Sequence, residues 1–232
     1  DANPLDIRPR HGSGASACGV KPHARYESYR YIPRLAEMYP VDEYFHYNLT
    51  HVCDSLQPWG LGVEEDDEPH ARVVFVPKDS RGPRMISCEP REYMFPQQGL
   101  NAKLTRTVER NHAVAAQVSW LDQRRNREYA RRGSLDPSLF ASLDLKEASD
   151  KLSWQLVKYL FPKPWRDAFE STRSLATTLP SGEIIPLSKF APMGSATCFP
   201  VESICFWAIA ASATEQVTLK RGTGDKNALR YC

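Results

Sequence analysis

The sequence predicts an α+β fold, because strand patterns and helix patterns occupy different stretches of its 232 residues. Two stretches, 72–88 and 177–185, each read as a β-hairpin with short apolar or β-branched runs on either side of turn residues. Three others, 91–110, 152–160 and 201–213, read as helices. A composition of 41% hydrophobic and 25% charged residues is typical of a folded chain rather than a disordered one.

One stretch combines a strand with a helix. Alternating apolar residues over 139–145 predict a short buried strand, and the apolar spacing from Leu152 onward predicts a helix. Asp144 and Asp150 flank the turn between them. A carboxylate at the end of a buried strand is costly unless it is paired, and a divalent metal is its usual partner. The alternative is that Asp144 caps the helix and Asp150 is a first-turn acid that the helix dipole stabilises.

The first predicted hairpin carries three cations near its tip. Strands over 72–76 and 84–88 are joined by a turn that contains Gly-Pro, and Lys78, Arg81 and Arg84 lie around it. Three cations so close repel one another unless an anion lies among them. A triphosphate would suit, because arginine offers bidentate geometry and lysine a point charge. An exposed hairpin without a ligand is the alternative.

Positive charge is concentrated in the middle of the chain. Residues 72–132 contain 13 Lys and Arg against 6 Asp and Glu, a net +7 that leaves −5 for the remainder. Lys103, Arg106 and Arg110 share one face of the predicted helix 91–110, and five arginines between 124 and 132 continue the charge. This distribution favours a polyanion partner, with a merely solvated basic surface as the alternative.

The remaining segments are read more simply. Residues 10–15 predict a glycine-containing loop, 26–58 an irregular cap with short helical stretches, and 64–68 a solvated acidic linker. The loop over 193–197 leads into an apolar helix, 201–213, that we expect to be buried on nearly all sides. Backbone donors where this loop meets the helix suit a phosphate or a sugar, and an ordinary helix cap is the alternative.

Several classes of protein are disfavoured. The chain has no apolar signal region and no apolar run near the ~20 residues of a membrane span, so we expect no membrane partner. It begins without methionine, which we interpret as the interior of a longer polypeptide. The cysteines show no CxxC spacing, which argues against zinc and against a disulfide framework and favours a reducing compartment. They are Cys18, Cys53, Cys88, Cys198, Cys205 and Cys232.

Three motifs, taken in order, resemble those of the RNA-directed RNA polymerases of positive-strand RNA bacteriophages, the levivirus replicase family. Residues 76–84, followed by Glu89-Pro90, are similar to the basic fingers motif of that family. Residues 144–150 resemble its first metal-binding motif in the palm, and 193–203 resemble the motif that recognises template and ribose. The resemblance covers roughly residues 10–215 and includes a looser match at the glycine-containing loop.

The resemblance implies a right-hand polymerase fold with fingers and an incomplete palm. The segments would be an N-terminal fingers or cap region (1–70), a basic fingers region (71–135) and a palm (136–232). It also implies template-directed RNA synthesis by two-metal nucleotidyl transfer. The family's Gly-Asp-Asp motif is missing, since 224–226 carries a single acid, so we expect a chain truncated before that motif and inactive or nearly so alone.

The resemblance assigns roles to individual residues. Asp144 would be catalytic and, with the backbone carbonyl of Leu145, would hold Mg²⁺, with Mn²⁺ as an alternative. Lys146 and Glu147 stand where the family has small residues, and Ser195 where many relatives carry Asn. The residues that would bind the nucleotide are Lys78, Arg81, Arg84, Asp150 and Ser195. Those that would contact RNA are Gly194, Thr197, Lys103, Arg106 and Arg110.

Partners and location follow from the same resemblance. They would be an RNA template and product, nucleoside triphosphates, and host proteins such as translation elongation factors, in the cytoplasm of a bacterial host. The main alternative is a non-catalytic basic RNA-binding module that uses the 72–132 face, for which replacing Asp144 would change nothing. A DNA-directed or reverse-transcribing palm is a lesser alternative.

Overall fold

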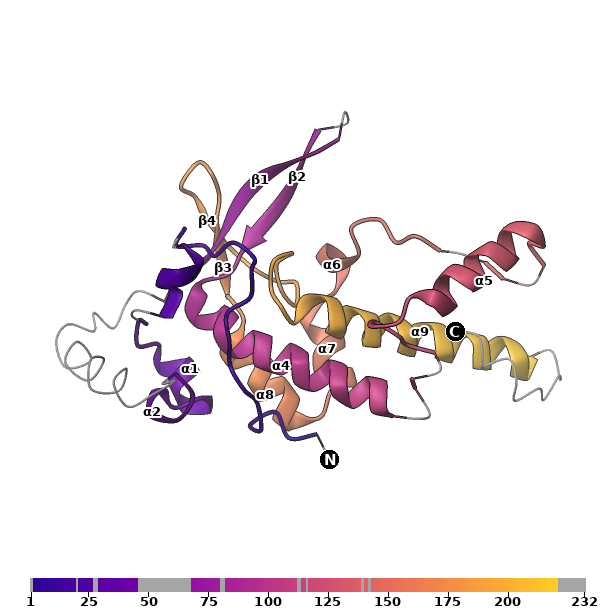
Figure 1. Cartoon of the computed structure of the whole chain (residues 1–232), viewed down its shortest axis with the longest axis horizontal. Helices are drawn as coiled ribbons and strands as arrows, with labels where there is room; N and C mark the ends of the chain where they lie inside the picture. The colour runs from indigo at the N-terminus through magenta and orange to yellow at the C-terminus, as the bar shows by residue number, and fades with distance from the viewer. Residues whose placement is uncertain are drawn as a thin grey trace.

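The computed structural model describes residues 2–19, 21–26, 29–45, 68–79, 82–111, 114–115, 117–138, 140–141 and 143–220, without the side chains of residues 22, 78, 79 and 218–220. Helices and a small sheet share this chain, as the predicted α+β class requires (Figure 1). The strands are β1 (Ala71–Asp79), β2 (Gly82–Cys88), β3 (Ala176–Thr178) and β4 (Ile184–Pro186). The helices are η1 (Pro22–Tyr26), α1 (Pro33–Met38), α2 (Val41–Tyr44), α4 (Arg91–Arg110), α5 (Arg124–Leu135), α6 (Ala148–Lys151), α7 (Trp154–Leu160), α8 (Lys163–Thr172) and α9 (Cys198–Lys220).

The sheet has the strand order β2-β1-β3-β4, and both predicted hairpins are confirmed within it. β1 pairs with β2 in an antiparallel register that runs from Arg72–Cys88 to Val76–Arg84. β3 and β4 form the second antiparallel pair, and the two hairpins join through a short parallel pairing of β1 with β3. The outer part of the β1–β2 hairpin extends away from the helices as an arm (Figure 1).

The hydrophobic core lies among the helices. Its most buried large side chains come from α4, α8, the residue that follows α1 and the segment before α9, and they include Tyr39, Tyr93, Leu100, Phe169 and Phe190. α4 has the bounds predicted for the helix 91–110. The N-terminal segment closes one side of the core with α1 and α2, which confirms short helices in the described part of the expected cap. The boundaries proposed between the three segments stay predictions.

The predicted strand over 139–145 is wrong. Its described residues are irregular, and Leu143 and Leu145 are 85% and 53% exposed. A strand needs a neighbour for its backbone hydrogen bonds, and no strand of the described chain pairs with this stretch. The predicted helix after it is confirmed as α7, whose N-cap is Ser153, so Asp144 does not cap it.

The prediction for the apolar helix is only partly right. In the first two turns of α9, Cys198, Val201 and Cys205 are buried in the core, whereas Phe199 is 60% exposed. Beyond them the helix runs past α7 and α8, and Ile209 and Val217 are about half exposed, at 50% and 48% (Figure 1). No helix in the described chain is both long enough and apolar enough to span a membrane.

The acidic run was predicted to be a solvated loop, but Glu68, at its end, is only partly exposed and is paired. The Glu68 carboxylate accepts hydrogen bonds from the guanidinium of Arg34 and, at 2.7 Å, from the Tyr93 hydroxyl. The rest of the run, 64–67, lies outside the described residues. The glycine-containing loop is confirmed as a loop, in which the Gly12 carbonyl accepts a 2.6 Å hydrogen bond from Arg25.

Candidate functional site

A cavity of about 820 Å³ lies between the outer half of strand β2 in the β1–β2 arm and α6. Residues 82–85 of β2 form one wall, and residues 144–150 form the facing wall. Met193 and Glu202 close the cavity from the loop before α9 and from α9 itself. Three stretches that are far apart in sequence, each singled out by its motif, therefore meet around one cavity.

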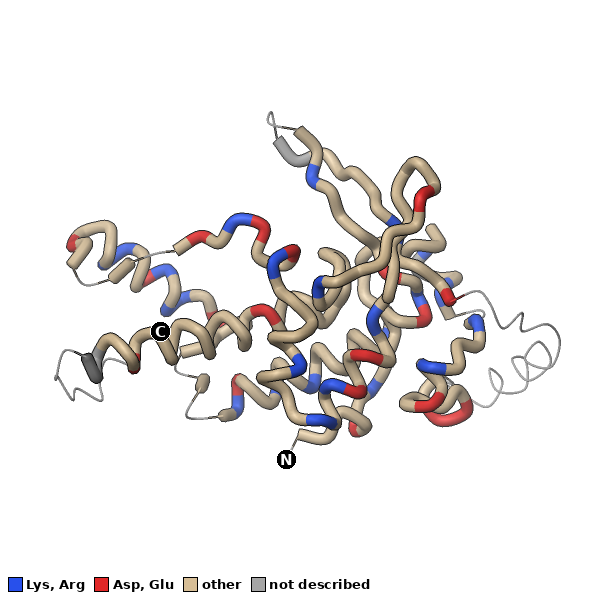
Figure 2. Tube along the Cα trace, turned by 180° about the vertical axis from the view of Figure 1, so that it is seen from behind, with Lys and Arg blue, Asp and Glu red and all other residues tan. Residues whose placement is uncertain are grey.

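The walls carry charges of both signs. Arg84 stands on the strand wall, and both it and Asp144 on the facing wall are exposed. Acidic and basic positions also alternate along the segment that leads into α6 (Figure 2). The arrangement offers a cation for an anionic ligand on one side and carboxylate oxygens on the other.

The turn before α6 has an unusual backbone. Glu147, on the cavity wall, has φ 56°, and it is the only described residue other than glycine with a positive φ. Its carbonyl accepts hydrogen bonds from the amides of Asp150 and Lys151, at 3.0 and 3.2 Å. A left-handed conformation costs a residue with a side chain about 1–2 kcal/mol, so the surrounding contacts must hold this turn in place.

Asp150 is held by an ion pair. Its carboxylate bonds to the ammonium of Lys189, which the sequence analysis did not select. The backbone of Lys189 forms an isolated bridge with Ser153, and the next amide, of Phe190, donates to the Leu152 carbonyl at 2.7 Å. Asp150 is thus fixed relative to the start of α7.

Glu202, which lies within the motif over 193–203, is a third acid on the cavity wall beside Asp144 and Asp150. Burial raises the pKa of its carboxyl above the ordinary value, and the Cys198 thiol one turn earlier donates to it at 3.8 Å. The spacing of Cys198 and Glu202 in the sequence does not predict that Glu202 lines the cavity, because only the tertiary fold brings α9 against it.

The loop before α9 is packed tightly on β2. The Ser87 amide donates to the Met193 carbonyl at 3.1 Å, and a Cβ on Gly194 would lie 2.2 Å from the Ser87 carbonyl oxygen. Ser195 and Thr197 are buried, and their hydroxyls bond to each other at 3.0 Å. Of this loop, only Met193 lines the cavity.

The other predicted site residues lie elsewhere. The side chain of Lys78 and the whole of Arg81 fall outside the described residues. On α4, Lys103 forms an ion pair with Asp6, and the neighbouring ammonium lowers the pKa of that carboxyl. Arg106 and Arg110 are exposed on the same helix, and none of these three predicted RNA-contacting residues lines the cavity.

A metal ion would find few ligands here. Among the residues that the structure describes, no group of three His, Cys, Asp or Glu lies close enough together to hold one. Asp144 and Leu145 both belong to the cavity wall. One carboxylate with one carbonyl matches Mg²⁺, which keeps several waters and binds substrate phosphates as well.

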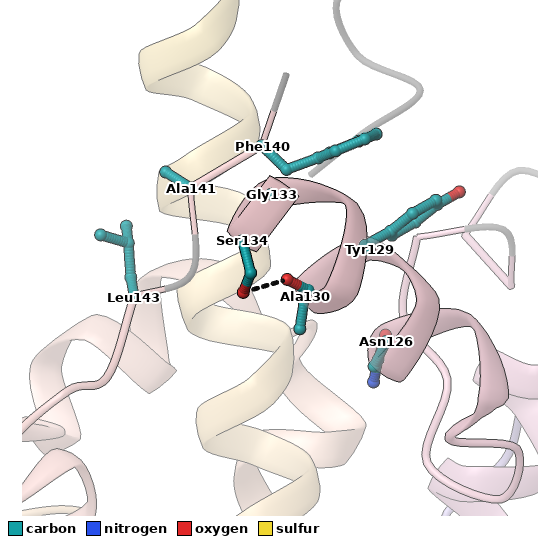
Figure 3. Close-up of a pocket in the computed structure, with 8 residues that line it drawn as sticks. All are labelled: Asn126, Tyr129, Ala130, Gly133, Ser134, Phe140, Ala141 and Leu143. Carbon is teal, nitrogen blue, oxygen red and sulfur yellow. Dashed lines mark hydrogen bonds between the residues drawn. The ribbon is translucent and has the colours of Figure 1, made fainter. Parts of the chain in front are cut away.

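A second pocket, of about 350 Å³, lies where Phe140, Ala141 and Leu143 face α5 (Figure 3). Tyr129 stacks on Phe140 with ring centroids 4.9 Å apart, and the guanidinium of Arg132 lies 5.1 Å from the Phe140 ring centroid. A Cβ on Gly133 would lie 2.7 Å from the Phe140 carbonyl oxygen, so the two segments are in close contact. α5 itself has no buried residue, and all five of its arginines are exposed.

Comparison with known proteins identifies the family. Residues 64–224 match the RNA replicase, beta-chain family, and the chain belongs to it. It is 37% identical over 152 residues to the RNA-directed RNA polymerase subunit beta of Enterobacteria phage SP, and 33% identical over 154 residues to that of Escherichia virus Qbeta. Each match covers 66% of this chain and 25% of the relative. A third relative, the RNA-directed RNA polymerase beta chain of Escherichia phage MS2, is 34% identical over 165 residues, which are 68% of this chain and 29% of the relative.

These matches confirm the resemblance to the levivirus replicases. The chain spans about a quarter of the length of the curated relatives that it matches.

Proposed function

We propose that this chain forms the fingers and part of the palm of a right-hand RNA-directed RNA polymerase that copies an RNA template. The observation that carries the proposal is the 820 Å³ cavity, on which Arg84, Asp144 and Met193 converge from three separate motifs. Its volume falls in the range of roughly 300–1,000 Å³ that is common for small-molecule sites. The names of the relatives support the same activity.

Each wall of the cavity has a role in this proposal. Arg84, together with Lys78 and Arg81, neutralises the triphosphate and the charge that develops on it during transfer. Asp150, on the cavity wall, senses the 2′-hydroxyl that distinguishes ribose from deoxyribose. Ser195, which is buried in the adjoining loop and does not line the cavity, shares this role in the proposal. The reaction joins the 3′-hydroxyl of the growing RNA to the α-phosphorus of the nucleotide, and pyrophosphate leaves.

Mg²⁺, with Mn²⁺ as the alternative, fits the donor set of this wall. The residues that would hold it are Asp144, through its carboxylate, and Leu145, through its backbone carbonyl. When bound, the ion supplies charge stabilisation to phosphoryl oxygens. For the whole polymerase we further propose two-metal transfer and an RNA product. We also propose host protein partners such as translation elongation factors, and a location in the bacterial cytoplasm.

Nucleotide binding to this chain tests the proposal directly. Asp144→Asn should abolish the Mg²⁺ dependence of nucleoside triphosphate binding, measured by isothermal titration calorimetry. Arg84→Gln should weaken that binding at least about tenfold, because a charge-assisted hydrogen bond contributes about 1.5–3 kcal/mol. The matched control is Asp167→Asn, an exposed acid on α8 outside the cavity. Unchanged binding in both cavity variants would refute the proposal.

A second candidate function, a non-catalytic RNA-binding module, is favoured by α5. A helix that buries nothing and carries five arginines suits a phosphate backbone better than a protein core. Two of the arginines also form local ion pairs, Arg124 with Asp122 and Arg131 with Glu128.

Salt dependence separates the two candidates. Arg127→Ser should reduce the slope of log affinity against log salt by about 0.7–0.9 if that side chain contacts a phosphate. Lys163→Ser, on α8, is the matched control. If the α5 variant lowers RNA affinity while Asp144→Asn leaves nucleotide binding and RNA synthesis by the whole polymerase unchanged, the module is the better description.

A further inference from the structure

A buried polar network lies beneath the loop before α9. Glu89, which follows β2, and Gln97, in the second turn of α4, are both 0% exposed. The Gln97 amide nitrogen donates to the Glu89 carboxyl at 3.3 Å and to the Thr172 carbonyl at 2.6 Å. Its amide oxygen accepts from the backbone N–H of Ala196 at 3.1 Å. One side chain thus links the end of the arm, the end of α8 and the loop.

The chemistry of the neighbours determines the orientation of this amide. The Thr172 carbonyl can only accept a hydrogen bond, and the Ala196 N–H can only donate one. Glutamine has both a donor and an acceptor at its end, whereas an apolar side chain has neither and an ionised glutamate has no donor.

Glu89 extends the network and is shielded from solvent. Its second oxygen accepts a hydrogen bond from the Ser174 hydroxyl, and burial raises the pKa of the carboxyl, an effect that the hydrogen bonds from Ser174 and Gln97 and the nearby Arg173 partly oppose. Removing one hydrogen-bond partner from groups this deeply buried lowers stability, because no water can take its place.

The loop has few other attachments to the elements below it. β2 holds its start, through the Ser87–Met193 hydrogen bond and the close packing of Gly194 on Ser87. Gln97 holds its end, at Ala196. Between these anchors lies Ser195, and the two cavity residues Met193 and Glu202 lie on either side of the Ala196 anchor in sequence.

We propose that Gln97 is a positioning residue, which holds the 193–197 loop against the cavity through Ala196 and thereby determines how well the site distinguishes ribonucleotides from deoxyribonucleotides. This inference rests on the proposed function, because the discrimination belongs to a polymerase. Gln97 acts only through the loop, since its own side chain is buried away from the cavity.

Kinetics of the whole polymerase that contains this chain test the role. Gln97→Leu should raise the KM for ribonucleotides and lower the ratio of ribo- to deoxyribonucleotide incorporation about tenfold, with a smaller change in kcat. Gln97→Met has nearly the same length but no acceptor for the Ala196 amide, so it should lower the ratio as well, and it serves if the leucine variant does not fold. The control is Phe169→Leu, a core substitution outside the network that should lower stability but leave the ratio unchanged.

A second measurement separates this inference from the proposed function. Hydrogen exchange of the Ala196 amide in the 232-residue chain should be slow, and at least tenfold faster in Gln97→Leu at equal global stability. A slow amide in a polymerase that copies no RNA would refute the function and support the anchor. An unprotected Ala196 amide, or an unchanged incorporation ratio in both Gln97 variants, would overturn the positioning role.

Discussion

Replacing Gly194 with alanine should destabilise the chain more than the same replacement at Gly182. Both glycines have positive φ, 149° and 88°, so both substitutions strain the backbone by roughly 1–2 kcal/mol. At Gly182 nothing lies within 4 Å of the added Cβ, whereas at Gly194 the Ser87 carbonyl oxygen would lie 2.2 Å away. The comparison therefore separates backbone strain from a steric clash.

The clash cannot be relieved by a flexible side chain, because the opposing atom is backbone. The loop must move away from β2, which breaks the hydrogen bond between the Ser87 amide and the Met193 carbonyl, about 0.5–1.5 kcal/mol. The added methyl also stiffens the unfolded chain, but equally in both variants. We expect a loss of about 3 kcal/mol for Gly194→Ala and about 1 kcal/mol for Gly182→Ala.

Urea unfolding followed by tryptophan fluorescence measures both losses. In thermal unfolding a chain of this size should lose about 6–12 °C in Tm for Gly194→Ala and about 2–4 °C for Gly182→Ala. Equal losses in the two variants would refute the close packing of this loop on β2, and with it the geometry of the candidate site.

Three further predictions concern side chains in and beside the helical core. Burial and the neighbouring Arg25 lower the pKa of His11 from 6.5 to about 4, so the unfolded chain binds a proton more readily than the folded one. The free energy of unfolding should therefore be full above pH 6.5 and fall by about 1–2 kcal/mol as the pH drops to 4. A His11→Gln variant whose stability falls just as steeply with pH would contradict this. Arg34→Met should lower the free energy of unfolding in urea by about 2–4 kcal/mol, since the guanidinium bonds to a carboxylate, the Tyr93 hydroxyl and two backbone carbonyls. A loss no larger than that of Tyr93→Phe would count against this role. Phe169→Ala should cost about 3–5 kcal/mol because the ring is 1% exposed, and a loss below 1 kcal/mol would show that this core is not packed as described.

Local sequence patterns predicted the elements whose hydrogen bonds join residues that are close in sequence. The β1–β2 hairpin and the bounds of α4 agree with the patterns over 72–88 and 91–110. A turn that contains Gly-Pro and a helical apolar spacing act over a few residues, so the sequence around them is sufficient.

Elements that depend on a distant partner were predicted poorly. The alternation over 139–145 indicated which residues share a face, but not whether another strand lies beside them, and Leu143 is exposed. The apolar character of α9 predicted burial along its whole length, yet only its first turns reach the core. The hydrophobic effect acts on surfaces that are in contact, and a pattern within one segment cannot supply the second surface.

The sequence by itself determined the motifs, the basic middle of the chain and the family that they resemble. Only the tertiary structure decided that Arg84, Asp144 and Glu202 share a cavity, that Lys189 pairs with Asp150, and that Gln97 anchors the loop at Ala196. These contacts join residues up to about a hundred positions apart, and their geometry depends on how β2, α4 and α9 pack. Packing is a property of the whole chain, which no single stretch of sequence encodes.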